Sequence, residues 1–190
     1  MKTRNIAVAA MLSAVAFVLQ YIEVPIPIMP SFIKLLGAFV LGLLYGVVIE
    51  LVKNLIHMAV SQSMFVGELS NFILGAAFTC TAGLIYKHKK TKVTAFVGGV
   101  AGAAVMALVS IISNYFVVYP VYYNFMPEEV ILGMYQVIFS GVNSILECLL
   151  VFNLPFTFVK GLLSVLVTML IYKPLSPIMK GRQRDDGAAK

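Results

Sequence analysis

Ionisable side chains interrupt the long apolar stretches of this sequence, and several amide side chains accompany them. The ionisable candidates are Glu50, Lys53, His57, Glu68, Glu147 and Lys160, and the amides are Asn54, Asn71, Asn114, Asn143 and Asn153. A charged group inside an apolar segment is costly unless a partner or a ligand binds it. These side chains are therefore the candidates for hydrogen bonding and charge pairing with a small molecule.

The same residues form no catalytic or metal-binding pattern. The sequence contains no HExxH, GxSxG, GxxxxGK[ST] or GxGxxG motif, and no carboxylate pair stands out as an acid–base couple. His57 has no second ligand at metal-binding spacing, and Cys80 and Cys148 have no CxxC neighbour. We therefore predict a protein that is not an enzyme, with no catalytic residues, no metal and no cofactor.

The composition is typical of a membrane protein. The chain has 190 residues, of which 61% are hydrophobic and 12% charged, and its mean hydropathy is +0.96. Soluble domains have roughly 45–50% apolar and about 25% charged residues. The net charge of +6 does not indicate a nucleic-acid partner, because basic residues of membrane proteins collect on the cytoplasmic side of the spans.

The elements that must position the polar residues are membrane-spanning helices, which need about 20 apolar residues each. The apolar stretches are 6–22, 35–60, 69–86, 93–118, 130–152 and 154–172. The second stretch is too short for two full spans, and we expect it to form a short hairpin that turns near Gly42 and Gly46. We predict an all-α integral membrane protein with a single membrane domain, 1–175, and a polar, disordered tail, 176–190.

Basic residues set the predicted topology. They form three clusters, which are Lys2 and Arg4, then Lys87, Lys89, Lys90 and Lys92, then Lys173, Lys180, Arg182 and Arg184. The positive-inside rule places all three clusters in the cytoplasm, so an even number of crossings must separate them. This holds if the hairpin crosses twice and if residues 119–152 are largely an excursion at the outer face. We predict six transmembrane helices, the second one short, with both termini cytoplasmic and the loops after Tyr21, around Gln62 and after Tyr119 facing outward.

This topology gathers polar groups from several helix ends at the outer face. They are Lys53, Asn54, His57, Glu68, Asn71, Asn114 and Lys160, with Tyr115, Phe116, Tyr119 and Phe156 as aromatic walls. A pocket with apolar walls and a few convergent polar groups suits a flat, partly polar small molecule. We predict a substrate-binding site for such a molecule there.

Structural roles compete with binding for several of these residues. Glu50 and Lys53 are three residues apart and can neutralise each other, while His57 can be a packing partner. Glu68 lies at a helix start, where the dipole favours a carboxylate. Asn114 can instead form an interhelical hydrogen bond. Lys160 has no acidic neighbour in sequence and so needs a partner or a ligand.

Small residues mark possible helix-packing faces. Ala10 and Ala14 form one small-xxx-small pair, and Gly98 and Gly102 form another. Such pairs let helices approach closely in lipid. The glycine pair favours packing within the chain, whereas the pattern in general also suits docking of another membrane subunit.

Several segments resemble one family in the same order along the chain. They are Glu23-Val-Pro-Ile-Pro, Val47-Val-Ile-Glu-Leu-Val-Lys-Asn-Leu-Ile-His57, Gly67-Glu-Leu-Ser-Asn-Phe-Ile-Leu-Gly-Ala76, Asn114-Tyr-Phe-Val-Val-Tyr-Pro120 and Leu154-Pro-Phe-Thr-Phe-Val-Lys-Gly161. Together they resemble the riboflavin-specific substrate-binding subunit of energy-coupling factor (ECF) vitamin transporters, the RibU family. The similarity runs from about residue 6 to residue 172.

The resemblance implies six helices with cytoplasmic termini in a bacterial-type plasma membrane. It implies riboflavin as the transported ligand, held near the outer face with hydrogen bonds from Asn114 and Lys160. It also implies partners, namely a membrane coupling subunit and two ATPase subunits, with Ala10 and Ala14 docking on the coupling subunit. The family carries an Asp-Phe-Ser-Asp-like segment before its second helix, whereas here Ser31-Phe-Ile-Lys34 leads directly into Leu35. We therefore expect a shortened gating loop.

Two other functions fit the same residues. The chain can be a binding subunit of this class for another vitamin or small heterocycle, or a structural membrane protein that transports nothing. Flavin spectra separate the first from the riboflavin reading. In the second case, replacing Asn114 and Lys160 would change stability alone.

Overall fold

The structure is a computed structural model that describes residues 3–21, 29–59 and 65–180, and within these residues every regular element is helical. The elements are α1 (Thr3–Tyr21), α2 (Met29–Val40), α3 (Leu43–Met58), α4 (Val66–His88), α5 (Lys92–Ser113), η1 (Asn114–Val118), α6 (Tyr119–Tyr122), α7 (Glu128–Gln136), α8 (Ile145–Cys148), η2 (Leu149–Asn153) and α9 (Leu154–Lys180). The helical class predicted from composition is confirmed. The predicted loops after Tyr21 and around Gln62, and residues 181–190 of the predicted tail, lie outside the described residues.

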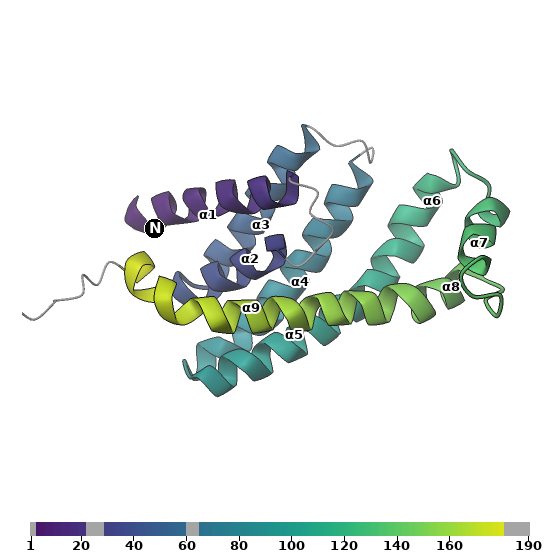
Figure 1. Cartoon of the computed structure of the whole chain (residues 1–190). Helices are drawn as coiled ribbons and strands as arrows, with labels where there is room; N and C mark the ends of the chain where they lie inside the picture. Colours follow the sequence, from purple (N-terminus) through teal and green to yellow (C-terminus); the bar gives the residue numbers. More distant parts are fainter. Residues whose placement is uncertain (1–2, 22–28, 60–64, 181–190) are drawn as a thin grey trace, which may run out of the picture.

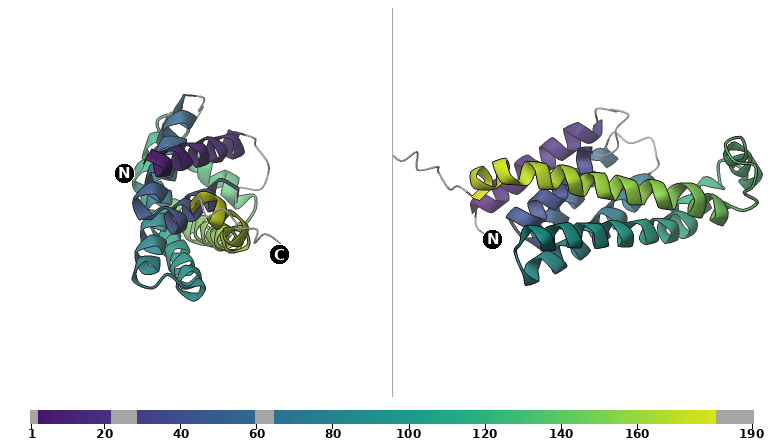
Figure 2. Two further views of the ribbon diagram at one scale, coloured as in Figure 1. Left: turned by 90° about the vertical axis from the view of Figure 1, so that its left-hand side faces the viewer. Right: turned by 60° about the horizontal axis from the view of Figure 1, so that its bottom comes forward.

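The helices form an elongated bundle. Figures 1 and 2 show α1 on one side and α5 on the other, with α2 and α9 between them, and the helix contacts agree with this order. Three helical stretches are long and apolar enough to cross a membrane, which are Val66–His88, Lys92–Tyr122 and Ile145–Lys173. Thr3–Leu19 and Ser31–Val40 are shorter apolar helices. This is the architecture of a membrane protein.

The predicted hairpin is present, but its first helix begins earlier than expected. The chain breaks at Gly42, whose φ of 116° favours glycine, between α2 and α3. The second helix begins at Met29 and not at residue 35, so residues 31–34 are helical. Gly46 lies inside α3, where a Cβ would be 2.7 Å from Ala38 and Thr79 side-chain atoms, so it serves close packing rather than the turn.

Residues 119–152 were predicted to be largely an excursion at the outer face. Of the helices in this region, α7 alone is separate from the long helical stretches on either side. The segment from Ile145 to Asn153 instead continues into α9, so the last long helix begins at Ile145 rather than at residue 154. Likewise, the stretch expected to end at residue 118 continues to Tyr122. Pro120 and Pro155 therefore lie inside continuous helical stretches.

Both helices contain a π-helical segment just before their proline. Each π-helical segment ends two residues before a proline, η1 before Pro120 and η2 before Pro155. Proline lacks an N–H and its ring clashes with the carbonyl four residues earlier, and a wider π-helical turn relieves this clash. The two helices therefore pass their prolines without stopping.

Glycines bring α4, α5 and α9 together. A Cβ on Gly102 would lie 2.8 Å from the backbone oxygen of Phe78 on α4, and one on Gly98 would lie 2.9 Å from that of Ala82. On α9, a Cβ on Gly161 would lie 2.6 Å from the Ala103 side chain. The predicted packing role of Gly98 and Gly102 within the chain is confirmed.

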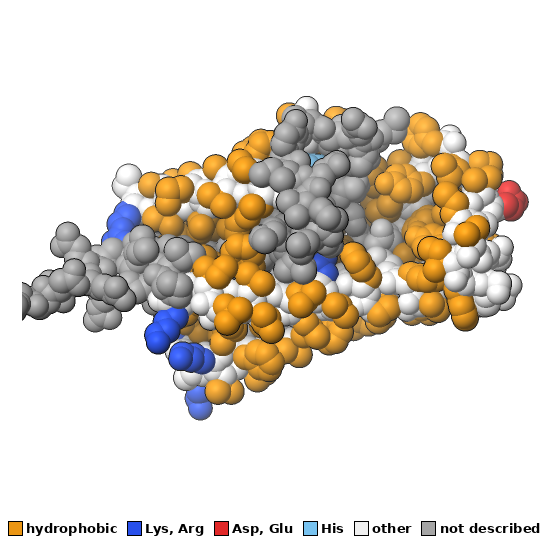
Figure 3. Space-filling model, in the orientation of Figure 1, with side chains coloured by type: hydrophobic (Ala, Val, Ile, Leu, Met, Phe, Trp, Pro, Cys, Tyr) orange, Lys and Arg blue, Asp and Glu red, His pale blue; other side chains and the backbone are white. Residues whose placement is uncertain are grey.

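Charge is distributed unevenly along the bundle. Figure 3 shows basic side chains gathered at the end where α1 begins and α9 finishes, and acidic ones at the opposite end. Figure 1 places the α4–α5 connection at that same basic end. The described members of the three predicted basic clusters therefore share one end of the molecule, as the charge argument required.

Candidate substrate-binding site

The centre of the candidate site is a buried ion cluster between α2 and α3. Glu50 Oε1 lies 3.2 Å from Lys34 Nζ and 3.1 Å from Lys53 Nζ, and all three residues are buried. Glu50 and Lys53 are one helical turn apart, and Lys34 comes from the neighbouring helix. The mutual neutralisation expected for Glu50 and Lys53 is present, but it is only part of a three-residue cluster.

Polar groups around this cluster are incompletely satisfied. Asn54 Nδ2 donates to the backbone oxygen of Glu50 at 2.8 Å and to its Oε1 at 3.2 Å. Among the described residues, Glu50 Oε2, Asn54 Oδ1 and Thr79 Oγ1 are buried without a hydrogen-bond partner. Buried polar atoms in proteins nearly always have a partner, so these three atoms are exceptions to the general rule.

The cluster carries more positive than negative charge. Lys160 of α9 is within electrostatic range of Glu50 and Lys53, which places three ammonium groups beside one carboxylate. Within the described part of the chain, the Lys160 ammonium group makes no hydrogen bond or ion pair.

Lys160 lies deeper than the sequence suggested. Because the last helical stretch runs from Ile145 to Lys173, Lys160 is near its middle rather than near its start. At 1.5 Å per residue, it is about 20 Å from Lys173 at the basic end. A lysine at the middle of a span is the kind of residue that marks a ligand pathway.

A second polar pair joins α3 to α4, about one helical turn further along α3 than the cluster. His57 Nδ1 is 2.9 Å from Glu68 Oε1, and the carboxylate is buried. Asn54 and Glu68 also line a pocket of about 270 Å³ whose other walls are apolar side chains, among them Leu55, Phe65 and Phe72. Glu68 has a structural partner in His57 and at the same time faces this pocket.

A seam of hydroxyl and amide groups joins α4, α5 and η2. Ser70 Oγ lies 3.0 Å from Ser113 Oγ, and Asn153 Nδ2 donates to Ser110 Oγ at 3.3 Å. Asn114 Nδ2 donates to the backbone oxygen of Ser110, one turn earlier on its own helix, at 2.7 Å. The interhelical bond considered for Asn114 is thus made by Ser70 and Asn153 instead.

The structure brings only some of the predicted site residues together. Asn54, Glu68 and Lys160 surround the cluster and the pocket beside it. Tyr119 is buried, and its hydroxyl is 2.7 Å from that of Tyr135 on α7, so it joins α7 to the bundle.

Three of the predicted site residues face away from the interior of the bundle, namely Asn71, Tyr115 and Phe156. Tyr115 and Phe156 are 41% and 58% exposed, and Asn71 is exposed as well. Successive residues on a helix are turned by about 100°, so the inward positions are taken by neighbours such as Ser70 and Thr157. These three residues do not line the cluster.

Lys34 is the functional candidate that sequence reasoning missed. It lies one residue before the second predicted apolar stretch, 35–60, and so outside the predicted spans. The available signal was its spacing within 29–40, where a helix places a lone lysine between apolar residues on both sides.

No metal site accompanies these groups. Across residues 3–21, 29–59 and 65–180, no set of three or more His, Cys, Asp and Glu side chains is close enough to hold a metal ion. The site is built from ammonium, amide, hydroxyl and apolar groups, which can bind an uncharged or anionic organic molecule by hydrogen bonds. Together with the helical bundle, this defines a membrane-embedded small-molecule binding protein.

The comparisons with known proteins agree with this class. Residues 4–172 match the family described as ECF transporter, substrate-specific component, and the chain belongs to this family. The resemblance seen in the motifs is therefore confirmed.

Similar proteins include two riboflavin transporters. RibU of Staphylococcus aureus (strain TCH60) is 32% identical, with 94% of each chain covered. FmnP of Bacillus subtilis (strain 168) is 28% identical, covering 93% of this chain and 94% of the relative. A solved structure described as the S component of a bacterial ECF transporter superposes with a TM-score of 0.70 at 31% identity, covering 95% of this chain and 99% of that one. These relatives are transporter components and not enzymes.

Proposed function

We propose that this chain is the riboflavin-binding subunit of an ECF transporter in the cell membrane. It captures riboflavin at the outer face and delivers it inward together with a membrane coupling subunit and two ATPase subunits. The observation that carries the proposal is the similarity to riboflavin transporters over nearly the whole chain, at 28–32% identity. The buried polar cluster in the middle of the bundle supports it.

Riboflavin offers groups that match the site. Its ring system is flat and carries carbonyl oxygens, and its ribityl chain carries hydroxyls. The Lys160 ammonium group donates to such oxygens, and the orphan acceptors on Glu50 and Asn54 accept from hydroxyls. Asn114 contributes through its amide oxygen, which makes no hydrogen bond to the described residues.

The test is a riboflavin titration of the purified full chain in detergent, followed by flavin fluorescence. Saturable quenching is expected for the natural sequence. Lys160→Ala should weaken binding by about 10- to 100-fold, because a hydrogen bond to a charged group contributes about 1.5–3 kcal/mol and 1.4 kcal/mol is tenfold.

Lys173→Ala is the matched control, because Lys173 lies on the same helix but at the basic end. It should leave riboflavin affinity unchanged. A folded protein that gains no flavin signal would refute riboflavin as the substrate and favour another vitamin. Equal loss in both variants would refute the assigned site.

We also propose the membrane arrangement and the docking face of the subunit. Six helical stretches cross the membrane, with both termini in the cytoplasm, and the basic end supports this orientation. On α1, Ala9, Ser13 and Ala16 are buried against the bundle, whereas Ala10 and Ala14 are exposed. The exposed pair leaves a shallow face on which a helix of the coupling subunit fits closely.

Docking and binding can be tested separately. Ala10→Trp with Ala14→Trp should abolish riboflavin uptake by cells that carry the complete transporter, because the side chains fill the docking face. Flavin titration of the isolated variant should match the natural chain. Uptake at the normal rate would exclude this face. Val15→Trp is the single-site control, because Val15 is also on α1 and exposed but is turned by about 100° from Ala14.

A further inference from the structure

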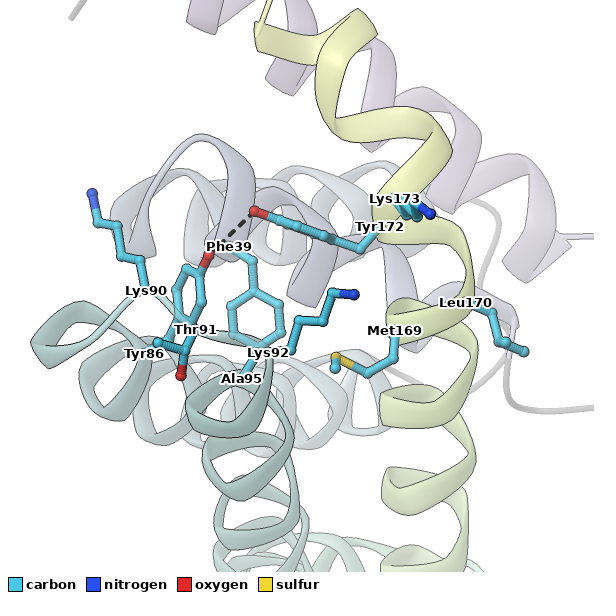
Figure 4. Close-up of a pocket in the computed structure, with 10 residues that line it drawn as sticks. All are labelled: Phe39, Tyr86, Lys90, Thr91, Lys92, Ala95, Met169, Leu170, Tyr172 and Lys173. Atoms are coloured by element: carbon cyan, nitrogen blue, oxygen red, sulfur yellow. Dashed lines mark hydrogen bonds between the residues drawn. The ribbon is translucent and has the colours of Figure 1, made fainter.

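A second pocket lies at the basic end of the bundle, away from the ion cluster. It has a volume of about 350 Å³ and is enclosed by the end of α4, the start of α5 and the late part of α9. Figure 4 shows its lining residues. Its walls are largely aromatic and aliphatic, and its polar rim consists of Lys90, Thr91, Lys92 and Lys173.

The aromatic wall is internally fastened. The hydroxyls of Tyr86 and Tyr172 are 3.2 Å apart and join α4 to α9 across the pocket. The rings of Phe39 and Tyr86 pack with their centroids 4.7 Å apart. These contacts fix the aromatic side chains of the wall against one another.

The rim carries positive charge that the described chain does not compensate. Lys90, Lys92 and Lys173 line the pocket, and no carboxylate of the described residues does. The ion pairs within the described residues involve Glu50 and Glu68, and none reaches these lysines. In Figure 4, Lys92 extends toward Tyr172 and Met169, whereas Lys90 points away from them. An anion in the pocket would meet positive charge from the lysines of its rim.

The surface beside the pocket is apolar. Leu170 lines the pocket and is 69% exposed, and Val93, next to Lys92, is 72% exposed. In a membrane protein such residues face lipid chains. A ligand here therefore meets ammonium groups at one end and hydrocarbon-compatible surface at the other.

We propose that this pocket binds the phosphate group of an anionic phospholipid, with an acyl chain lying along Leu170 and Val93. Basic pockets between helices on the cytoplasmic side suit acidic lipid headgroups, and each lysine near an anionic headgroup contributes about fivefold in affinity. The inference does not rest on riboflavin as the substrate, because it uses neither the ion cluster nor its ligands.

The experiment is native mass spectrometry of the full chain in detergent, titrated with phosphatidylglycerol and, separately, with phosphatidylcholine. Retention of one phosphatidylglycerol in preference to phosphatidylcholine is expected. Lys92→Gln with Lys173→Gln should weaken this retention by about tenfold or more. Lys87→Gln with Lys89→Gln is the matched control, because it removes the same charge from the same end without touching the pocket.

Three outcomes would overturn the proposal. Equal weakening in the two double variants would show a general surface-charge effect. Equal retention of the two lipids would show that the phosphate charge is not recognised. Displacement of phosphatidylglycerol by an equal concentration of glycerol phosphate would show that a free phosphate suffices and that the acyl chain contributes nothing. Thermal unfolding of each variant in detergent reports whether it is folded.

Discussion

At the scale of single residues, Glu50 is the carboxylate on which the buried cluster depends. One of its oxygens accepts from both Lys34 and Lys53, and its neighbour Gly75 leaves room for the carboxylate, since a Cβ there would overlap it. Removing one partner of a buried ion pair is more damaging than replacing the pair as a whole, because an uncompensated charge stays behind.

Glu50→Gln should therefore destabilise the protein strongly, by about 3–5 kcal/mol, because it leaves the ammonium groups of Lys34 and Lys53 without a counter-charge. Lys34→Met should cost much less, since Lys53 still pairs with the carboxylate. Thermal unfolding in detergent measures both. A Glu50→Gln variant that melts at the natural temperature would contradict the structural role of the cluster.

At the scale of elements, small residues allow α4, α5 and α9 to pack closely. The π-helical segments allow the long helices to continue past their prolines. The apolar core of this region joins Phe78 and Ala82 of α4 to Ala103 and Met106 of α5 and to Val165 of α9. In lipid, helices associate by close packing and not by the hydrophobic effect. Added volume at a glycine contact should thus separate the helices directly.

Gly102→Ala should lower stability by about 1–3 kcal/mol, because its Cβ would meet the backbone of Phe78, which cannot move aside like a flexible side chain. Gly133→Ala on α7 is the control, since a Cβ there meets nothing within 4 Å. Thermal unfolding of the two variants should separate them. Equal melting temperatures would show that the α4–α5 contact tolerates an added methyl group.

At the scale of the whole molecule, the two ends differ in charge. Basic residues of α1, the α4–α5 connection and α9 share one end, and the exposed Glu128 and Glu129 of α7 lie toward the other. Of this asymmetry, the position of the Lys and Arg residues is what orients membrane proteins during insertion, because Asp and Glu contribute little.

The proposed orientation predicts the reactivity of single cysteines. With Cys80 and Cys148 both replaced by Ala, Glu129→Cys should react with a membrane-impermeant maleimide applied to intact cells. Lys89→Cys should react only after the cells are opened. The reverse pattern would invert the topology, and labelling of both in intact cells would exclude six crossings with both termini inside.

The sequence by itself determined the helical class, the membrane environment, the family and the shared basic end. These follow from composition, from the length of apolar stretches and from the positions of lysines, which are local properties of the chain. The break at Gly42 was predictable for the same reason. The starts of the second and last helices were not, because proline and polar residues suggested loops where neighbouring helices and π-helical turns keep the chain helical.

Only the tertiary structure decided which of the polar side chains lie together. Asn54, Glu68 and Lys160 were predicted, but Lys34 was not, and Asn71, Tyr115 and Phe156 face outward. Which side of a helix faces inward depends on its rotation within the bundle, and one residue of shift turns a side chain by about 100°. Packing against neighbouring helices sets that rotation, so a charge on α2 can meet one on α3 although no pattern along the chain connects them.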